Sequence, residues 1–355
     1  MRVLLAMSGG VDSSVAGALL LRAGHDVVGV TMKLWGGESD TGCCSVSDVD
    51  DARRVAQQLG IDHLVFNFGD DFARHVVDPY VADHVRGVTP NPCIECNRHL
   101  KFDRLLRRAD QLGFDAIATG HHARIVPWES EMAVVRGVDR AKDQSYVVHM
   151  LDRAALHRTL FPVGEFDKSE IRQMAADLGL RTASKPDSQD VCFITSTGGR
   201  WTFLGDRIPF RPARVVDTDG TEVGAVESVE MVTIGQRRGV GLPGGGPKRY
   251  VVDVDVDAGL VTVGSESELD REALLVARVT WSGPGARAAA AQSDVLVQCS
   301  AHSAPRAARL EVLDDAAASV RVRWASPERR VAPGQSVAFY DPTDTRVLGG
   351  GIVTE

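Results

Sequence analysis

Two groups of residues in this chain could carry chemistry: a glycine-containing polar turn near the N-terminus and a set of scattered cysteines. The turn, Ser8 to Ser14, lies between a short apolar run and a stretch with helical periodicity. Glycines let a backbone approach a ligand closely, and a helix N-terminus offers unpaired N–H groups and a partial positive charge. The turn therefore predicts a phosphate or pyrophosphate site, although it lacks the lysine of a kinase-type P-loop.

The cysteines Cys93 and Cys96 form a C-x-x-C pair within residues 89–97, which two prolines mark as a loop ahead of a predicted helix over 99–112. A cysteine near a helix N-terminus and close to Arg98 and Lys101 is expected to have thiolate character. C-x-x-C is also half of a zinc site, but the sequence offers no second pair or histidine cluster to complete one.

The other cysteines differ in their surroundings. Cys192 lies in a second polar, turn-rich segment, residues 185–193, and is a further candidate nucleophile. Cys299 lies in an alternating, strand-like stretch and is predicted to belong to the core. For Cys43 and Cys44, which follow a glycine in a loop, a structural or incidental role is favoured.

Three further polar segments are candidates for a site. His121 and His122 follow a predicted strand and could act as bases; metal binding is less favoured because no carboxylate lies at ligand spacing. The cluster 142–146 fits either a site or a solvated turn. The segment 233–239 combines a turn with two arginines, which suits phosphate contacts and equally suits a solvated basic turn.

The first half of the chain predicts the elements that position these residues. Apolar runs over 3–7, 26–32, 63–67 and 115–119 alternate with helical patterns such as 47–59. Strands separated by helices indicate an α/β fold with a parallel sheet, whose ligands bind at the carboxyl ends of the strands. Met32, Gly120 and the polar turn all follow or end such strands, so one pocket could gather them.

From about residue 201 the pattern changes to short alternating strands between glycine-rich turns, over 213–216, 250–254, 260–263, 310–313, 319–324 and 336–340. We therefore predict three domains: an α/β catalytic domain over 1–200, a small β-rich domain over 201–275 and a C-terminal β-barrel over 276–355.

Composition excludes several classes of protein. The 355 residues carry a formal charge of −8, which argues against a protein that coats nucleic acid non-specifically. No apolar run approaches the ~20 residues of a membrane helix, and a strand at the very N-terminus leaves no room for a signal peptide. Six cysteines without a dense disulfide framework predict a reducing, cytoplasmic location.

The motifs together resemble the bacterial tRNA-specific 2-thiouridylases, the MnmA family, over nearly the whole chain. S-G-G-x-D-S is similar to the pyrophosphate loop of enzymes that split ATP into AMP and pyrophosphate. The segments that carry the resemblance are A-M-S-G-G-V-D-S at 6–13, T-P-N-P-C-I-E-C-N at 89–97, A-T-G-H-H-A at 118–123, K-D-Q-S-Y at 142–146, D-S-Q-D-V-C-F at 187–193 and T-I-G-Q-R-R-G at 233–239.

The resemblance implies binding residues for two substrates. ATP with Mg²⁺ would bind at Ala6, Met7, Ser8, Gly9, Gly10, Val11, Asp12, Ser13, Met32 and Gly120. The tRNA and its target base would contact Asn91, Pro92, Cys93, His121, Lys142, Asp143, Gln144 and Gln335.

The resemblance also implies a reaction. The C2 oxygen of the wobble uridine in the lysine, glutamate and glutamine tRNAs would be adenylated, releasing pyrophosphate. Cys192 would carry a persulfide from a cysteine desulfurase or sulfur-relay protein, and its terminal sulfur would displace AMP. Cys96 would release the sulfur and end in a disulfide with Cys192. The chemistry is consistent, because adenylation turns a poor leaving group into AMP, and the base must leave its stack to react.

Two departures from the family pattern leave alternatives open. Some relatives have an acid at the position of Cys93, so Cys93, Cys96 and Cys192 could instead hold a [4Fe-4S] cluster with one open iron. An Arg-Tyr pair of some relatives is replaced here by Ser300 and Ala301. A different pyrophosphate-loop enzyme, a ligase or amidase acting on a small molecule, is the other alternative.

Overall fold

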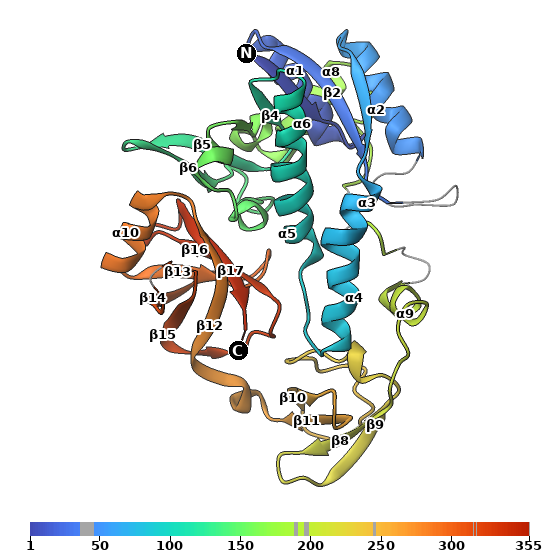
Figure 1. Ribbon diagram of the computed structural model, residues 1–355, viewed down its shortest axis with the longest axis vertical. Helices are drawn as coiled ribbons and strands as arrows, with labels where there is room; N and C mark the ends of the chain where they lie inside the picture. Colours follow the sequence, from blue (N-terminus) through green and yellow to red (C-terminus); the bar gives the residue numbers. More distant parts are fainter. Residues whose placement is uncertain are drawn as a thin grey trace.

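The computed structural model describes residues 1–35, 46–187, 191–194, 199–243, 246–314, 316 and 318–354. Three β-structures follow one another along the chain: a five-stranded parallel sheet, a four-stranded sheet and a closed barrel. The parallel sheet lies at one end of the molecule and the four-stranded sheet at the other, and the barrel lies beside the helices that run down the middle (Figure 1). The predicted α/β fold with β-rich domains behind it is confirmed.

The parallel sheet has the strand order β3-β2-β1-β4-β7. Its central strand is fully buried at Val3, Leu4 and Leu5, which explains why it is a continuous apolar run. All four predicted strands are present; the fifth is too short for a sequence pattern. The bounds are β1 (Arg2–Ala6), β2 (Asp26–Lys33), β3 (His63–Asn67), β4 (Ala116–Ala118) and β7 (Thr159–Leu160).

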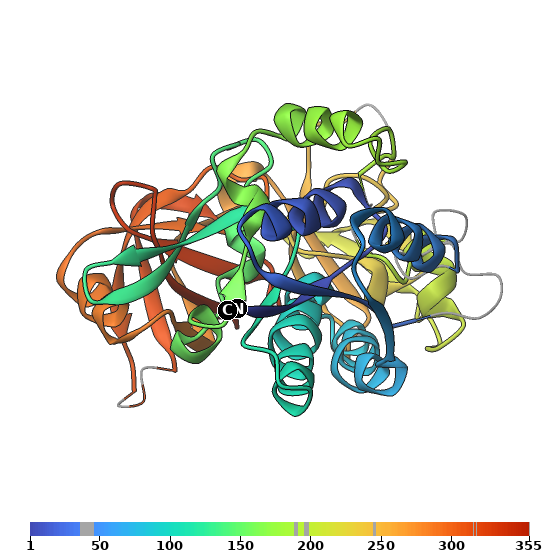
Figure 2. The ribbon, with the colours of Figure 1, turned by 90° about the horizontal axis from the view of Figure 1, so that it is seen from above.

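Helices cover both faces of this sheet. Because side chains alternate along a strand, Val3 and Leu5 pack with α1, α2 and α8 on one face, whereas Leu4 packs on the other. Figure 2 shows the two layers from above. The helices of the first face are α1 (Val11–Arg22), α2 (Val46–Leu59) and α8 (Lys168–Asp177). On the second face α6 (Leu105–Gln111), the end of the helix described next, packs against β4. The chain between β3 and that helix forms α3 (Gly69–Phe72), a π-helical segment (Ala73–Val77) and α4 (Asp78–Val85).

The C-x-x-C pair lies in a helix, so the predicted loop over residues 89–97 is wrong for its second half. Helix α5 (Pro92–Cys96) continues through a π-helical segment (Asn97–Arg104) into α6 (Leu105–Gln111). Asn91 caps it by accepting a hydrogen bond from the Ile94 amide at 3.4 Å. Proline is favoured at the first helical position, where its missing N–H costs nothing. Pro92 therefore marks a helix start rather than a loop.

A hairpin, β5 (Ala123–Trp128) and β6 (Glu131–Arg136), follows β4 and reaches the barrel, where the Arg136 amide donates to Thr345 O at 3.0 Å. The sequence did not predict it. Short helices connect the remaining segments: a 3₁₀ turn (Ser145–Val148), α7 (Arg153–Leu156), a 3₁₀ turn (Pro162–Glu165) and α9 (Gly199–Gly205).

The middle sheet has the order β10-β11-β8-β9, with a small valine core. Strands β8 and β11 are parallel, and the other pairs are antiparallel. Its elements are β8 (Ala213–Asp217), β9 (Glu222–Val226), a 3₁₀ turn (Val229–Met231), β10 (Tyr250–Asp255), β11 (Leu260–Gly264) and a 3₁₀ turn (Glu266–Leu269).

The barrel closes in the order β12-β15-β14-β13-β16-β17, and α10 packs against its core through Ala286 and Ala290. The expected domain boundary between residues 275 and 276 falls inside β12, so we propose Asp270 as the start of the barrel. The elements are β12 (Asp270–Trp281), α10 (Pro284–Gln292), β13 (Val295–Gln298), β14 (Arg306–Val312), β15 (Val320–Arg329), β16 (Ser336–Tyr340) and β17 (Val347–Val353). Within the described ranges, no helix has the length and apolar character that crossing a membrane requires.

Candidate active site

The polar turn after β1 forms a compact loop that opens α1. Gly10 is the extended residue before the helix, and its carbonyl accepts hydrogen bonds from the hydroxyls of Ser13 at 3.2 Å and Ser14 at 2.8 Å. Gly9 has a φ of +70°, which other residues rarely adopt. The helix N-terminus therefore points its first amide groups toward the carboxyl edge of the sheet, as an anion site requires.

Gly120 lies directly against this loop. A Cβ added at Gly120 would lie 2.7 Å from the Ser13 amide nitrogen and 2.9 Å from the Asp12 carbonyl carbon. Because β2 and β4 flank β1 on opposite sides, the loops after β1 and β4 border the crevice where such sheets bind ligands. Met32, near the end of β2 and almost buried, lies at the same edge.

Asp12, in the first turn of α1, is held by two basic side chains. Lys168 Nζ lies 2.7 Å from each carboxylate oxygen, and His122 Nε2 lies 3.0 Å from Oδ1. Burial opposes the charged form, but the hydrogen bonds from His122 and Lys168 outweigh it and lower the pKa of Asp12. The carboxylate is therefore ionised at neutral pH.

Further basic side chains lie at or near the loop, and most of them belong to no sequence motif. Lys185 Nζ contacts Gly9 O at 2.9 Å and the carboxylates of Asp48 and Asp51 at 2.7 and 2.8 Å. Asp187 accepts from Lys142 at 2.9 Å, Lys168 at 3.0 Å and Arg172 at 2.7 Å. Burial is again outweighed, here by hydrogen bonds from Lys142 and Lys168, and the pKa of Asp187 is lowered. The four cations are matched by four carboxylates, Asp12, Asp48, Asp51 and Asp187, so a bound polyphosphate would have to exchange with these carboxylates for the ammonium groups.

The sequence near these basic residues indicates their secondary structure but not their contact with the loop. Lys168 is the first residue of α8, directly after the capping box that Asp167 and Glu170 form. That motif locates a helix start, but it does not say that the helix begins beside a loop 156 residues away along the chain.

The two cysteine segments pack on one hydrophobic cluster below the sheet. Cys96 is almost buried in that cluster, and Cys192 packs against its surface. Phe193 anchors the Cys192 segment, with ring centroids 5.6 Å from Phe72 and 5.4 Å from Tyr80. Cys93, Cys96 and Cys192 are present as thiols. Residues 188–190 of the predicted motif lie outside the described residues.

Tyr80 connects the two segments. Burial raises the pKa of Tyr80 to about 12, with smaller contributions from Arg200, which lowers it, and from Cys93, which raises it. Tyr80 lines one cavity together with Pro92, the neighbour of Cys93, and is in ring contact with Phe193. Val191, directly before Cys192, has a φ of +53°, which is rare for a β-branched residue. Where the chain is described, no group of three or more histidine, cysteine or acidic side chains could hold a metal ion.

The remaining cysteines are set apart from this site. Cys299 follows β13 and packs against the barrel core, and burial raises its pKa to about 12. Its thiol is therefore protonated at neutral pH and poorly nucleophilic. Cys43 and Cys44 lie outside the described residues.

The predicted RNA-contacting residues divide into exposed and enclosed ones. His121 is almost buried between the rings of Phe102 and Phe161, and burial lowers its pKa well below the ordinary value. Lys142 is exposed, whereas the Asp143 carboxylate is enclosed. Gln144 Oε1 accepts from the His122 amide at 2.9 Å. The exposed arginines of the segment 233–239 are Arg237 and Arg238.

The loop before Cys93 contacts both the barrel and the middle domain. The Thr89 amide donates to Pro333 O in the barrel at 2.9 Å, and its hydroxyl donates to Thr233 of the middle domain at 3.2 Å. Gln335 Nε2 donates to Thr89 O at 2.7 Å. Asn91 and Pro92 also line a cavity of about 310 Å³ between α4, α5 and the barrel.

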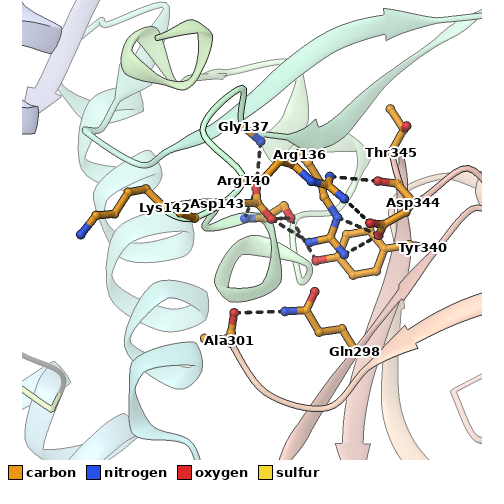
Figure 3. Close-up of polar contacts among 12 residues, drawn as sticks. Arg136, Gly137, Arg140, Lys142, Asp143, Gln298, Ala301, Tyr340, Asp344 and Thr345 are labelled. Atoms are coloured by element: carbon orange, nitrogen blue, oxygen red, sulfur yellow. Dashed lines mark hydrogen bonds and ion pairs between the residues drawn. The ribbon is translucent and has the colours of Figure 1, made fainter. Parts of the chain in front are cut away.

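At the barrel position of the replaced Arg-Tyr pair, Ser300 and Ala301 are exposed. Gln298 Nε2 donates to both of their carbonyls, at 2.9 and 3.1 Å. The contact with Ala301 is visible in Figure 3. The Gln298 side chain therefore fixes the turn, in which Ser300 and Ala301 themselves supply neither a cation nor a ring and the exposed His302 follows them.

Glu95, on the opposite face of α5 from the core, joins the helix to the barrel. Its carboxylate lies 3.1 Å from His99 Nε2, 3.2 Å from Arg278 Nη2 and 3.7 Å from Arg98 Nε. Burial opposes the charge, but these partners, His99 first, lower the pKa of Glu95 to about 2.

This pairing predicts a pH-dependent contribution to stability. A lowered pKa stabilises the fold above the ordinary value of 4.5, and the contribution is lost as the pH falls toward about 2. Glu95→Gln should therefore destabilise by a few kcal/mol at pH 6.5 and by clearly less at pH 3.5. Urea unfolding at both pH values measures the difference, with the exposed Glu266→Gln as control. A loss of unfolding free energy in Glu95→Gln that is the same at both pH values would contradict the lowered pKa of Glu95.

Comparison with known proteins gives one consistent result. Family models match the whole length: a tRNA methyl transferase HUP domain over residues 1–196, a tRNA methyl transferase PRC-barrel domain over 201–265 and an aminomethyltransferase beta-barrel domain over 271–353. Although these descriptions mention methyl transfer, the full-length relatives carry another name.

Three curated relatives are each called tRNA-specific 2-thiouridylase MnmA. The protein of Roseiflexus sp. (strain RS-1) is 44% identical, covering 99% of this chain and 98% of the relative. That of Chloroflexus aggregans is 45% identical, covering 98% and 97%. That of Mycolicibacterium paratuberculosis is 46% identical, covering 99% of both.

Proposed function

The chain belongs to the family of tRNA-specific 2-thiouridylases, which are tRNA sulfurtransferases, and we propose that it uses ATP to replace the C2 oxygen of the wobble uridine in the lysine, glutamate and glutamine tRNAs by sulfur. The observation that carries the proposal is that Met32, at the same edge of the sheet as the phosphate-binding loop, belongs to the hydrophobic cluster on which both cysteine segments pack. The tRNA substrate and the thiol chemistry fit a cytoplasmic enzyme.

In the first step, the C2 oxygen attacks the α-phosphorus of ATP and pyrophosphate leaves. We assign Ala6 to Ser13, Met32 and Gly120 to ATP. The helix N-terminus at Val11 and the Lys168 and Lys185 ammonium groups support this role, because they stabilise charge that grows on the departing pyrophosphate. Mg²⁺ would enter with the nucleotide and neutralise its phosphates.

In the second step, the terminal sulfur of a Cys192 persulfide attacks C2 and AMP leaves. Cys96 then attacks Cys192 Sγ, which releases the thiolated base and leaves a Cys96–Cys192 disulfide. A cellular thiol reductant must reopen this disulfide, and a cysteine desulfurase or relay protein must reload the persulfide. The common packing of both cysteines on one cluster supports this sequence.

The target base and its tRNA are assigned to Asn91, Pro92, Cys93, His121, Lys142, Gln144 and Gln335. The position of Asn91, Pro92 and Cys93 at the start of α5, and the contact of Gln335 with the loop before it, support this role. The enclosed His121 and the backbone-directed Gln335 would orient neighbouring segments, while exposed Lys142 suits a phosphate.

The [4Fe-4S] alternative requires Cys93, Cys96 and Cys192 to converge on one point. The three thiols are not arranged as such a ligand group within the described residues, so we derive no step through a cluster. The visible absorption spectrum of anaerobically purified protein separates the two mechanisms. A brown chromophore lost in Cys93→Ser would favour the cluster, and full activity of iron-free protein would exclude it.

Reconstitution tests the proposed function. Purified protein with MgATP, a persulfide donor and lysine tRNA transcript should produce 2-thiouridine and one pyrophosphate per thiolated base, measured by nucleoside mass spectrometry and pyrophosphate release. A transcript with cytidine at the wobble position is the control. Pyrophosphate release that needs no tRNA, without a thiolated nucleoside, would overturn the proposal in favour of a small-molecule ligase or amidase.

A further inference from the structure

Asp143 is enclosed in a complete hydrogen-bond network. Its Oδ2 accepts from Arg136 Nη1 and Ser145 Oγ, each at 2.7 Å. Its Oδ1 accepts from the Gly137 amide at 2.8 Å and the Ser145 amide at 3.2 Å. A carboxylate has about four acceptor sites, and the side chain is 5% exposed. Asp143 therefore has no acceptor capacity left for an RNA group.

The network joins the catalytic domain to the barrel. Arg136, at the end of β6, donates from Nε at 2.8 Å and from Nη2 at 2.6 Å to Asp344 Oδ1. Its guanidinium carbon lies 3.7 Å from the centroid of Tyr340, whose hydroxyl is 3.0 Å from Ser145 Oγ. Figure 3 shows Arg136 between Asp143 on one side and Asp344 and Tyr340 on the other.

The turn around Asp143 is connected to the candidate active site on both sides, through Gln144 and through Lys142. Gln144, next to Asp143, accepts from the His122 amide, and His122 contacts Asp12 of the pyrophosphate loop. Gly137 packs so closely that a Cβ there would lie 2.7 Å from His122 O. On the other side of Asp143, Lys142 points away from the network (Figure 3) and pairs with Asp187.

We propose that Asp143 is a positioning residue through which the docked barrel fixes His122 at the pyrophosphate loop and Lys142 beside Asp187. The inference rests on the proposed function. The barrel then has a second role besides any contact with RNA: it completes the geometry of the ATP site. A carboxylate facing the phosphate backbone would also repel it, whereas an enclosed carboxylate paired with Arg136 carries no such cost.

Asp344→Asn tests the coupling, because it weakens the charge pair from the barrel side without touching Asp143. We expect the KM for ATP to rise about tenfold, and tRNA-dependent pyrophosphate release to slow by a similar factor. The Kd for tRNA should stay within twofold. Arg140→Gln is the matched control: it removes an exposed partner of the same Asp344 and should change each value less than twofold.

Asp143→Asn distinguishes positioning from direct contact. Positioning predicts the same rise in KM for ATP as in Asp344→Asn, and the double variant should be no worse than either single one. Direct RNA contact predicts a weaker Kd for tRNA with the KM for ATP unchanged, and that result would overturn the proposal. Hydrogen exchange at the amides of residues 121–123 reports on the turn even if turnover is too slow to measure. Unchanged protection of these amides in both variants would also overturn the proposal.

Wild-type behaviour separates this inference from the proposed function. If the wild type shows no tRNA-dependent pyrophosphate release, the proposed function fails. If the wild type turns over normally and Asp344→Asn equals Arg140→Gln, only the coupling through Asp143 fails.

Discussion

Cys192→Ser should abolish formation of 2-thiouridine, by at least about a thousandfold, while tRNA-dependent pyrophosphate release continues. Adenylation needs only the loop and its cations, whereas a serine hydroxyl cannot carry a persulfide. Cys96→Ser should also stop turnover, but at a later stage. The bond between the thiolated base and Cys192 would then persist as a disulfide-linked complex of enzyme and tRNA.

Non-reducing gel electrophoresis with radiolabelled tRNA measures this difference. A band that disappears on addition of a thiol reductant is expected for Cys96→Ser and not for Cys192→Ser. Cys299→Ser is the matched control, since its buried thiol is protonated and lies in the barrel core. Normal thiolation by Cys192→Ser would eliminate the persulfide role of that residue.

Gly120→Ala should lower tRNA-dependent pyrophosphate release about a hundredfold. The added Cβ would lie 2.7 Å from Ser13 N and 2.9 Å from Asp12 C. Both are backbone atoms at the start of α1, so the loop itself must shift, and an error of about 1 Å in a substrate-positioning group can cost that factor.

The matched control for Gly120→Ala is Gly246→Ala, whose Cβ would meet no described atom within 4 Å. Pyrophosphate release assayed at saturating tRNA, with thermal melting of both variants, separates a displaced loop from a misfolded protein. Equal rates of pyrophosphate release for Gly120→Ala and the wild type would contradict the prediction, because they would show that the loop accommodates a methyl group at position 120.

The C-x-x-C segment illustrates how a correct motif can be given a wrong local structure. Two prolines around Asn91 favoured a loop, yet Asn91 and Pro92 are the cap and first residue of a helix. This signal was present in the sequence, because asparagine is a favoured N-cap residue and proline is favoured at the first position of a helix. The correction matters for chemistry, since it puts Cys93 and Cys96 in the first turns of α5.

Other features had no local signal at all. The Lys168 contact with Asp12 joins residues 156 positions apart, and the Arg136 contact with Asp344 spans 208 positions. Asp143 was assigned to the RNA by the family resemblance, but its carboxylate is filled by donors at positions 136, 137 and 145. The barrel, which comes much later in the chain, encloses this network through Asp344 and Tyr340. Charge pairs of this kind depend on which elements become neighbours.

The sequence by itself determined the polar loop that opens α1, four strands of the parallel sheet and the positions of the three cysteines, because these depend on residue type, periodicity and spacing within a few turns of chain. Only the tertiary structure decided which cations surround the loop, that the cysteine segments share one cluster, and that the barrel contacts the candidate active site through Arg136 and Thr89. The physical reason is burial. Side chains become enclosed and paired only after distant elements have packed, and a buried polar side chain must form its hydrogen bonds, which fix its position.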